Sequence, residues 1–169
     1  MLTLIAQVRI SRSKMLNVEE TQSPEEIRAV MCDPEIYERI SSDDCVSADE
    51  WVPASEGEYW VAGYIDGVLA AMFNIHPINP VNWEGHMQVL KPFRHHAHEL
   101  FNLAIAWAWD NTPAQKITVQ IPAIYPEVAQ FLKHHGFIVE GVNARSIQKY
   151  GVLLDQIYMG LERGDHGKG

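Results

Sequence analysis

The dipeptide Asp66-Gly67 stands between two largely apolar runs, EYWVAGYI (58–65) and VLAAMFNIHP (68–77). Two strand-like runs separated by Asp-Gly are typical of a tight β-hairpin, because both turn residues readily adopt positive φ angles. The two runs are therefore expected to be neighbouring antiparallel strands. Any fold for this chain must contain an antiparallel sheet built around them.

Strand and helix patterns alternate on both sides of this hairpin. Ser23, Pro24 and the two following glutamates are typical of a helix start, and Gly136 is typical of a helix stop. A break of the first helix is expected at Asp33-Pro34. The pattern predicts further strands at 15–22, 83–91 and 116–122, helices at 23–40, 97–111 and 125–135, and two last strands within 137–162. This order predicts an α+β fold in which helices cover one mixed sheet.

Composition limits the class of protein and its partners. The chain has 169 residues, 47% of them hydrophobic and 21% charged, which is ordinary for one soluble globular domain. The formal net charge of −9 argues against nucleic acid or an anionic membrane as the main partner. Cys32 and Cys45 form neither a metal-ligand spacing nor a disulfide framework, so we expect a cytoplasmic protein.

The domain is expected to begin near a second chain-start-like sequence, Met15-Leu16-Asn17-Val18. Residues 1–14 are interpreted either as an N-terminal extension or as an added edge strand. Residues 15–163 are expected to form a single domain. The tail at 164–169 is glycine-rich and charged, so we expect it to be disordered.

The segment VAQFLKHHGFIVEGVNARSIQKYGVLLDQIYMGLER (128–163) resembles the C-terminal part of the GCN5-related N-acetyltransferases, or GNAT proteins. The residues that match in order and spacing are Gly136-Phe137, Glu140-Gly141, Asp155 and Gly160-Leu161. The resemblance extends over 15–163 and is nearest to the branch that acetylates the N-termini of ribosomal proteins. It implies a GNAT-like mixed, mostly antiparallel central sheet flanked by helices. The sheet would be splayed between the fourth and fifth strands, 83–91 and 116–122, which would be parallel neighbours.

In the GNAT family, the loop after the fourth strand carries the pattern R/Q-x-x-G-x-G/A and holds the pyrophosphate of acetyl-CoA. Here that loop reads KPFRHHAHELF (91–101), with Arg94 at the first position and Ala97 and Glu99 in place of the glycines. A helix start presents unpaired N–H groups to an anion, so we expect the N–H groups of residues 96–100 to be free. The resemblance implies acetyl-CoA as co-substrate, held by Val89, Leu90, Arg94, His95, His96, Ala97, His98 and Glu99.

The histidines of this loop have a second interpretation, as metal ligands. Residues three apart share a helix face, so only His95 and His98 could bind one ion from a helical start. Zinc sites usually use three or four protein ligands. We therefore predict no metal site here. Exposed polar residues at a helix start are the simpler interpretation.

Acetyl transfer needs a group that takes a proton from the amine and one that protonates the departing thiolate. Glu84 and His86 have the same parity on strand 83–91, so they are expected to share one face. Glu84 is the candidate general base, with His86 as the alternative. The family's thiolate-side tyrosine position holds Leu132, and Tyr125 is the candidate replacement. Ser146 and Asp155 fall in the acceptor-side segment of the resemblance and are candidates for binding the amine.

Two functions are compatible with the resemblance. The first is an enzyme that transfers an acetyl group from acetyl-CoA directly to a small-molecule or peptide amine. The second is a non-catalytic GNAT-like protein that serves interaction or assembly, for example in phage virions, and the changed glycines favour it. Either protein could act as a homodimer or with an assembly partner.

Overall fold

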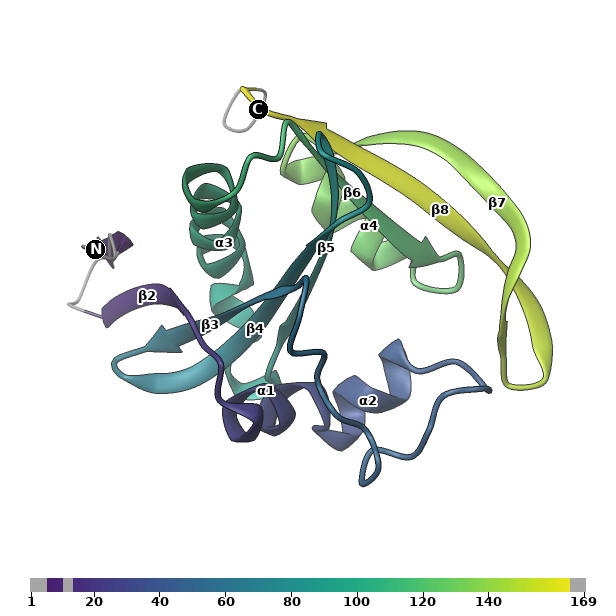
Figure 1. The fold of residues 1–169 in the computed structure, drawn as a ribbon, viewed down its shortest axis with the longest axis horizontal. Helices are drawn as coiled ribbons and strands as arrows, with labels where there is room; N and C mark the ends of the chain where they lie inside the picture. Colours follow the sequence, from purple (N-terminus) through teal and green to yellow (C-terminus); the bar gives the residue numbers. More distant parts are fainter. Residues whose placement is uncertain (1–5, 11–13, 165–169) are drawn as a thin grey trace. The chain divides into compact units, whose positions relative to one another are not determined.

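The computed structural model describes residues 6–10 and 14–164, and the last five residues of the predicted tail lie outside this range. The elements, labelled in Figure 1, are β1 (Ala6–Ile10), β2 (Lys14–Glu20), α1 (Pro24–Met31), α2 (Pro34–Ile40), β3 (Tyr59–Ile65), β4 (Val68–Pro77), β5 (Asn82–Val89), the 3-10 helix η1 (Lys91–His96), α3 (Ala97–Asn111), β6 (Lys116–Pro122), α4 (Pro126–His134), β7 (Ile138–Lys149) and β8 (Val152–Glu162). None of these described helices is long and apolar enough to cross a membrane.

The strands hydrogen bond in the order β1-β2-β3-β4-β5-β6-β8-β7. β5 and β6 are parallel, whereas β1 with β2, β2 with β3, β3 with β4, β6 with β8 and β7 with β8 are antiparallel. The parallel register joins only 82–84 to 116–118, while β6 continues along β8 to Pro122. The predicted α+β class, with a mostly antiparallel sheet that splays at the parallel β5–β6 pair, is confirmed.

The Asp66-Gly67 turn forms as the sequence predicts. Both residues have positive φ, 51° and 78°, and Ile65 pairs with Val68 across the turn. The Asp66 carboxylate also accepts the Met15 N–H at 2.8 Å, and the Asp66 N–H donates to the Met15 carbonyl at 2.8 Å. The turn therefore fixes the β3–β4 hairpin and the start of β2 together.

The chain divides into two compact units that interleave along the sequence. Unit 1 comprises the described residues of 1–39, 47–76 and 86–112, and unit 2 comprises 40–46, 77–85 and 113–164. Unit 1 carries β1 to β4, α1, η1 and α3. Unit 2 carries β6, α4, β7 and β8.

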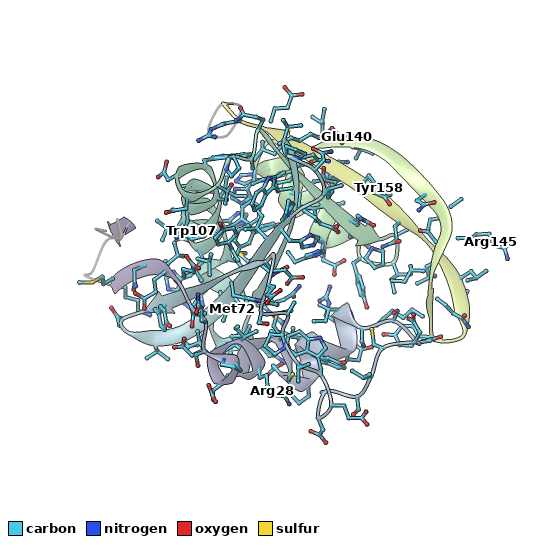
Figure 2. The ribbon with its side chains drawn as sticks, viewed as in Figure 1. Arg28, Met72, Trp107, Glu140, Arg145 and Tyr158 are labelled. Carbon is cyan, nitrogen blue, oxygen red and sulfur yellow. The ribbon has the colours of Figure 1, made fainter. Side chains whose placement is uncertain are left out.

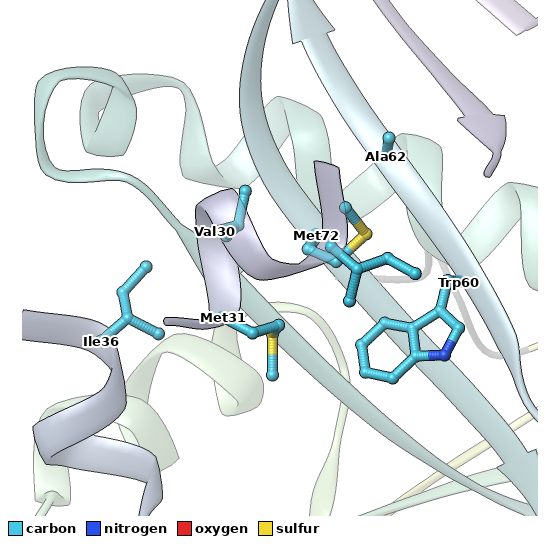
Figure 3. Close-up of a cluster of buried hydrophobic side chains, with 7 residues drawn as sticks. Val30, Met31, Ile36, Trp60, Ala62 and Met72 are labelled. Carbon is cyan, nitrogen blue, oxygen red and sulfur yellow. The ribbon is translucent and has the colours of Figure 1, made fainter. Parts of the chain in front are cut away.

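A cluster of buried side chains joins α1 and α2 to β3 and β4 in unit 1 (Figure 3). Ser23 caps α1 by accepting the Glu26 N–H, and Pro24 follows as the first helical residue. These signals fix where α1 begins. One face of the helix is buried, and burial of each large side chain stabilises the fold by about 1.5–3 kcal/mol. The cluster consists of Ile27, Val30, Met31, Ile36, Trp60, Ala62 and Met72.

In unit 2, the motif residues that carry the GNAT resemblance have structural roles. Gly136 ends α4 with φ 88°, and Phe137 is buried directly after it. Glu140 is the extra residue of a bulge in β7, and its carboxylate lies 2.5 Å from the Lys116 Nζ of β6. This ion pair crosses over Gly160, where a Cβ atom would lie 2.5 Å from Glu140 Oε1 and 2.8 Å from Lys116 Cε. Gly160 is therefore the residue that leaves room for the Glu140–Lys116 pair.

The first prediction tests this close approach. Gly160→Ala should lower the free energy of unfolding by about 1 kcal/mol, because the added methyl displaces the two charged side chains. In a chain of this size the melting temperature should fall by about 2–4 °C. Gly141→Ala is the matched control, since nothing lies within 4 Å of a Cβ atom there. Equal melting temperatures for the two variants would contradict the assignment.

Candidate functional site

The loop after β5 does not form an open turn but winds directly into α3. The Phe93 N–H donates to the Leu90 carbonyl at 2.9 Å, and the Ala97 N–H donates to the Arg94 carbonyl. Ala97 has ordinary helical angles, φ −58° and ψ −38°. The prediction of free N–H groups over residues 96–100 is therefore wrong at Ala97. Without a glycine to open the loop, residues 91–96 form a 3-10 helix that uses this donor internally.

Two cations of this loop converge on one carboxylate. Arg94 NH1 lies 2.7 Å from Glu35 Oε1, and Lys91 Nζ lies 3.7 Å from Glu35 Oε2. The hydrogen bond from Arg94 lowers the pKa of Glu35, so the carboxylate is charged at neutral pH. Sequence analysis missed Glu35, since it lies 59 positions before Arg94 and such a separation carries no spacing signal.

The loop histidines differ in their surroundings. His95 and His98 are exposed, whereas the His96 side chain is only 14% exposed. Both ring nitrogens of His96 are buried without a hydrogen-bond partner among the described residues, although its Nδ1 lies 3.9 Å from Glu99 Oε1. The His95 and His96 rings lie 4.1 Å apart between centroids. A buried, unpaired imidazole is unfavourable by about 1–3 kcal/mol, so His96 is suited to donating to an incoming anion.

The other predicted cofactor-binding residues contribute backbone groups. Val89 and Leu90 are half-buried at the end of β5. The Val89 carbonyl accepts from Arg94 Nε at 3.4 Å, and the Leu90 N–H donates to the Ala70 carbonyl at 2.9 Å. These contacts fix where η1 begins and hold the base of the Arg94 side chain.

The candidate bases lie on β5 with the predicted parity. Trp83 and Gly85 are buried, whereas Glu84 and His86 are half-buried, so the latter two project from the same side of the strand. In unit 1 the His86 ring stacks on the His76 ring of β4, with centroids 6.2 Å apart and planes at 25°. Sequence analysis missed His76. The two imidazoles are candidates for relaying a proton or for supplying two nitrogen ligands to a cation.

In unit 2, Ser146 and Asp155 flank a bulge of the β7–β8 hairpin. In this bulge, residues 144–146 of β7 lie opposite the single residue Asp155 of β8, and Arg145 has a positive φ of 53°. Asp155 Oδ1 accepts the Arg145 N–H at 2.8 Å, and Figure 2 shows the Arg145 side chain pointing away from the hairpin. The Ser146 hydroxyl lies 2.9 Å from the Asn143 carbonyl and from Gln156 Oε1. Both candidate acceptor residues therefore make contacts that hold the bulge.

The far end of this hairpin is held by the segment 40–46. Asp43 accepts the N–H groups of Tyr150 and Gly151 at 2.8 and 2.7 Å. Lys149, only 3% exposed, donates from Nζ to the Ser41 carbonyl at 2.7 Å. Sequence analysis missed this anchor, because its partners lie more than 100 residues apart.

Tyr125, the candidate acid, occupies the N-cap position of α4. It is half-buried, and its hydroxyl oxygen is shielded from solvent. Its N–H donates to the Pro122 carbonyl at 3.0 Å, which fixes the turn between β6 and α4. The residue is thus held at the end of β6 by backbone contacts.

No family model matches the chain, and no curated protein matches it in sequence. Solved structures do match. A spermidine N-acetyltransferase from Vibrio cholerae, in complex with CoA and spermine, gives a TM-score of 0.75 at 15% identity, over 89% of this chain and 96% of that chain. The chain has the GNAT fold. An acetyltransferase of the GNAT family from Streptococcus pneumoniae gives a TM-score of 0.68 at 15% identity, over 88% of this chain and 99% of that chain. A ribosomal-protein-alanine N-acetyltransferase from Brucella melitensis gives a TM-score of 0.66 at 15% identity, over 86% of this chain and 99% of that chain.

The contacts of Asp155 generate the second prediction. Asp155→Ala should lower the free energy of unfolding by about 1–2 kcal/mol, because the Arg145 N–H loses its charged acceptor. Asp155→Asn keeps an acceptor oxygen and should recover at least half of this loss. Chemical denaturation measures both variants. If Asp155→Ala is as stable as the unmodified chain, the carboxylate does not hold the bulge.

Proposed function

We propose that this chain is a GNAT-type N-acetyltransferase that moves an acetyl group from acetyl-CoA to an amine. The observation that supports this most directly is the loop between β5 and α3. In a chain with the GNAT fold, this loop places Lys91, Arg94 and the buried His96 nitrogens at the start of a helix of 15 residues. Cations and a helix start are the groups that bind a pyrophosphate.

In this proposal the side chains of the loop hold the cofactor in place of glycine-exposed N–H groups. Arg94 and Lys91 neutralise the pyrophosphate charge, and His96 donates a hydrogen bond from a ring that makes none within the described residues. Bound acetyl-CoA would supply the thioester that is attacked. The Glu99 carboxylate in the first turn of α3 opposes an anion and weakens binding.

The proposed chemistry is direct transfer. The amine nitrogen attacks the thioester carbonyl, loses a proton to Glu84 or to water held by it, and the tetrahedral intermediate expels the CoA thiolate. His86, on the same side of β5, is the alternative base. Tyr125 is proposed to protonate the thiolate. Such positioned proton transfers contribute about 10²–10⁴-fold to a rate.

The proposed acceptor is a cationic amine. The net charge of −9 attracts polyamines and basic peptides and repels acidic ones. The Vibrio cholerae protein was crystallised with spermine, and the Brucella melitensis protein is named for ribosomal-protein alanine. The proposed acceptor is therefore either a polyamine or a peptide N-terminus, the latter in line with the ribosomal-protein branch. Ser146 and Asp155 remain the proposed acceptor contacts, with Asp155 already accepting one backbone N–H.

A second candidate function is a non-catalytic assembly role, such as one in phage virions, as a homodimer or with another partner. Two observations favour it. The Ala97 N–H is used inside η1, and Arg94 is already paired with Glu35. Both contacts use a hydrogen-bond donor or a cation that could otherwise bind acetyl-CoA. A measurement of acetyl-CoA binding therefore distinguishes the two functions.

The third prediction concerns this binding. Acetyl-CoA at a hundred times its dissociation constant should stabilise the chain by about 2.7 kcal/mol. Glu99→Gly should bind acetyl-CoA more tightly, because it removes a like charge from the first turn of α3. Isothermal titration calorimetry and thermal unfolding measure both effects. Unmeasurable binding by both proteins would remove the enzyme and leave the assembly function.

The fourth prediction concerns the base. With spermidine, spermine and an alanine-terminated peptide as acceptors, Glu84→Gln should lower kcat at least about a hundredfold at neutral pH. Its affinity for acetyl-CoA should remain within about twofold of the unmodified value, since the change lies outside the loop. His86→Ala should reduce kcat less. Normal turnover by Glu84→Gln would exclude Glu84 from the reaction.

A further inference from the structure

The cations of the η1 loop are occupied by a residue of the same chain. Glu35 presents one oxygen to Arg94 at 2.7 Å and the other to Lys91 at 3.7 Å. The Glu35 and Arg94 side chains are 42% and 38% exposed, so solvent and dissolved anions reach the pair. A carboxylate that bridges two cations in this way occupies the donors that a phosphate group would use.

The position of Glu35 is fixed by α2. The helix starts at Pro34, and Asp33 Oδ1 accepts the N–H groups of Glu35 and Ile36 at 3.1 and 3.3 Å. Ile36, the next residue, is 2% exposed and belongs to the buried cluster of unit 1. With its backbone capped and its neighbour buried, Glu35 is held where its side chain reaches Arg94. The contact is therefore built into the fold of unit 1.

We propose that Glu35 is an internal competitor for the anion site of the η1 loop. A diphosphate group must displace the Glu35 carboxylate from Arg94 and Lys91 before it can bind them. Glu35 thus sets the anion affinity of the loop, and anion binding releases α2 from it. This proposal rests on the proposed function for its natural ligand, the diphosphate of acetyl-CoA, but the competition itself concerns any diphosphate.

The size of the effect follows from charge. A unit negative charge about 4 Å from a bound anion in water weakens binding about fivefold. Glu35→Gln removes this charge and keeps the shape and polarity of the side chain. Because exposed charges are screened by salt, the difference should shrink as the ionic strength rises.

The experiment is an NMR titration of the full chain with inorganic diphosphate at low ionic strength. Glu35→Gln should bind about fivefold more tightly than the unmodified chain. Glu56→Gln is the charge-matched control, because Glu56 is exposed in unit 1 and makes no hydrogen bond or ion pair with the described residues. It should leave the affinity unchanged. In an Arg94→Gln background, Glu35→Gln should give a smaller gain, because only Lys91 remains as a cation that Glu35 and the anion share.

Equal diphosphate affinity of Glu35→Gln and the unmodified chain, including no binding by either, would overturn the proposal. So would an equal gain in Glu56→Gln, or a gain of the same size in the Arg94→Gln background. Repeating the titration with acetyl-CoA tests the acetyltransferase function separately from the competition by Glu35. Tighter diphosphate binding by Glu35→Gln without acetyl-CoA binding by any variant would keep Glu35 as the competitor and reject the acetyltransferase function.

Discussion

The parallel pairing of β5 with β6 is the constraint on which the architecture depends. Parallel neighbours cannot be joined by a tight turn, so the chain between them must cross over, and here η1 and α3 form that connection. The register is fixed where Thr118 Oγ1 donates to Asn82 Oδ1 at 2.7 Å. The crossover must leave from the carboxyl end of β5. This places Lys91, Arg94 and the loop histidines together at the start of α3.

This chain departs from the glycine-based phosphate loop of the GNAT pattern in a way that changes the physics of the site. Glycine loops bind anions through backbone N–H groups. These groups carry no net charge, so a carboxylate of the same chain does not neutralise them. Here Ala97 continues the helix and its N–H is used internally, so binding would depend on side chains. Side-chain cations can be neutralised by the chain itself, as Glu35 does with Arg94. An anion site built from side chains is therefore open to internal competition.

The β7–β8 hairpin of unit 2 shows why motif residues must be interpreted with their contacts. Glu140 and Asp155 both belong to the GNAT resemblance, and both carboxylates hold bulges, through Lys116 and the Arg145 N–H. Asp43 fixes the turn at the far end. Three acidic side chains thus shape one long hairpin (Figure 2 labels Glu140 and Arg145). Their negative charge contributes to the net charge of −9, and their contacts within the structure hold the hairpin.

The sequence by itself determined the features that depend on neighbouring residues: the Asp66-Gly67 turn, the α1 start at Ser23, the α4 stop at Gly136 and the shared side of Glu84 and His86. These follow from φ preferences, caps and strand parity, which act over a few residues. Only the tertiary structure decided that Glu35 meets Arg94, that His76 stacks on His86 and that Lys149 reaches Ser41. Such pairs form when the packing of distant elements closes long loops. The spacing of residues along the chain does not predict which distant side chains will come into contact.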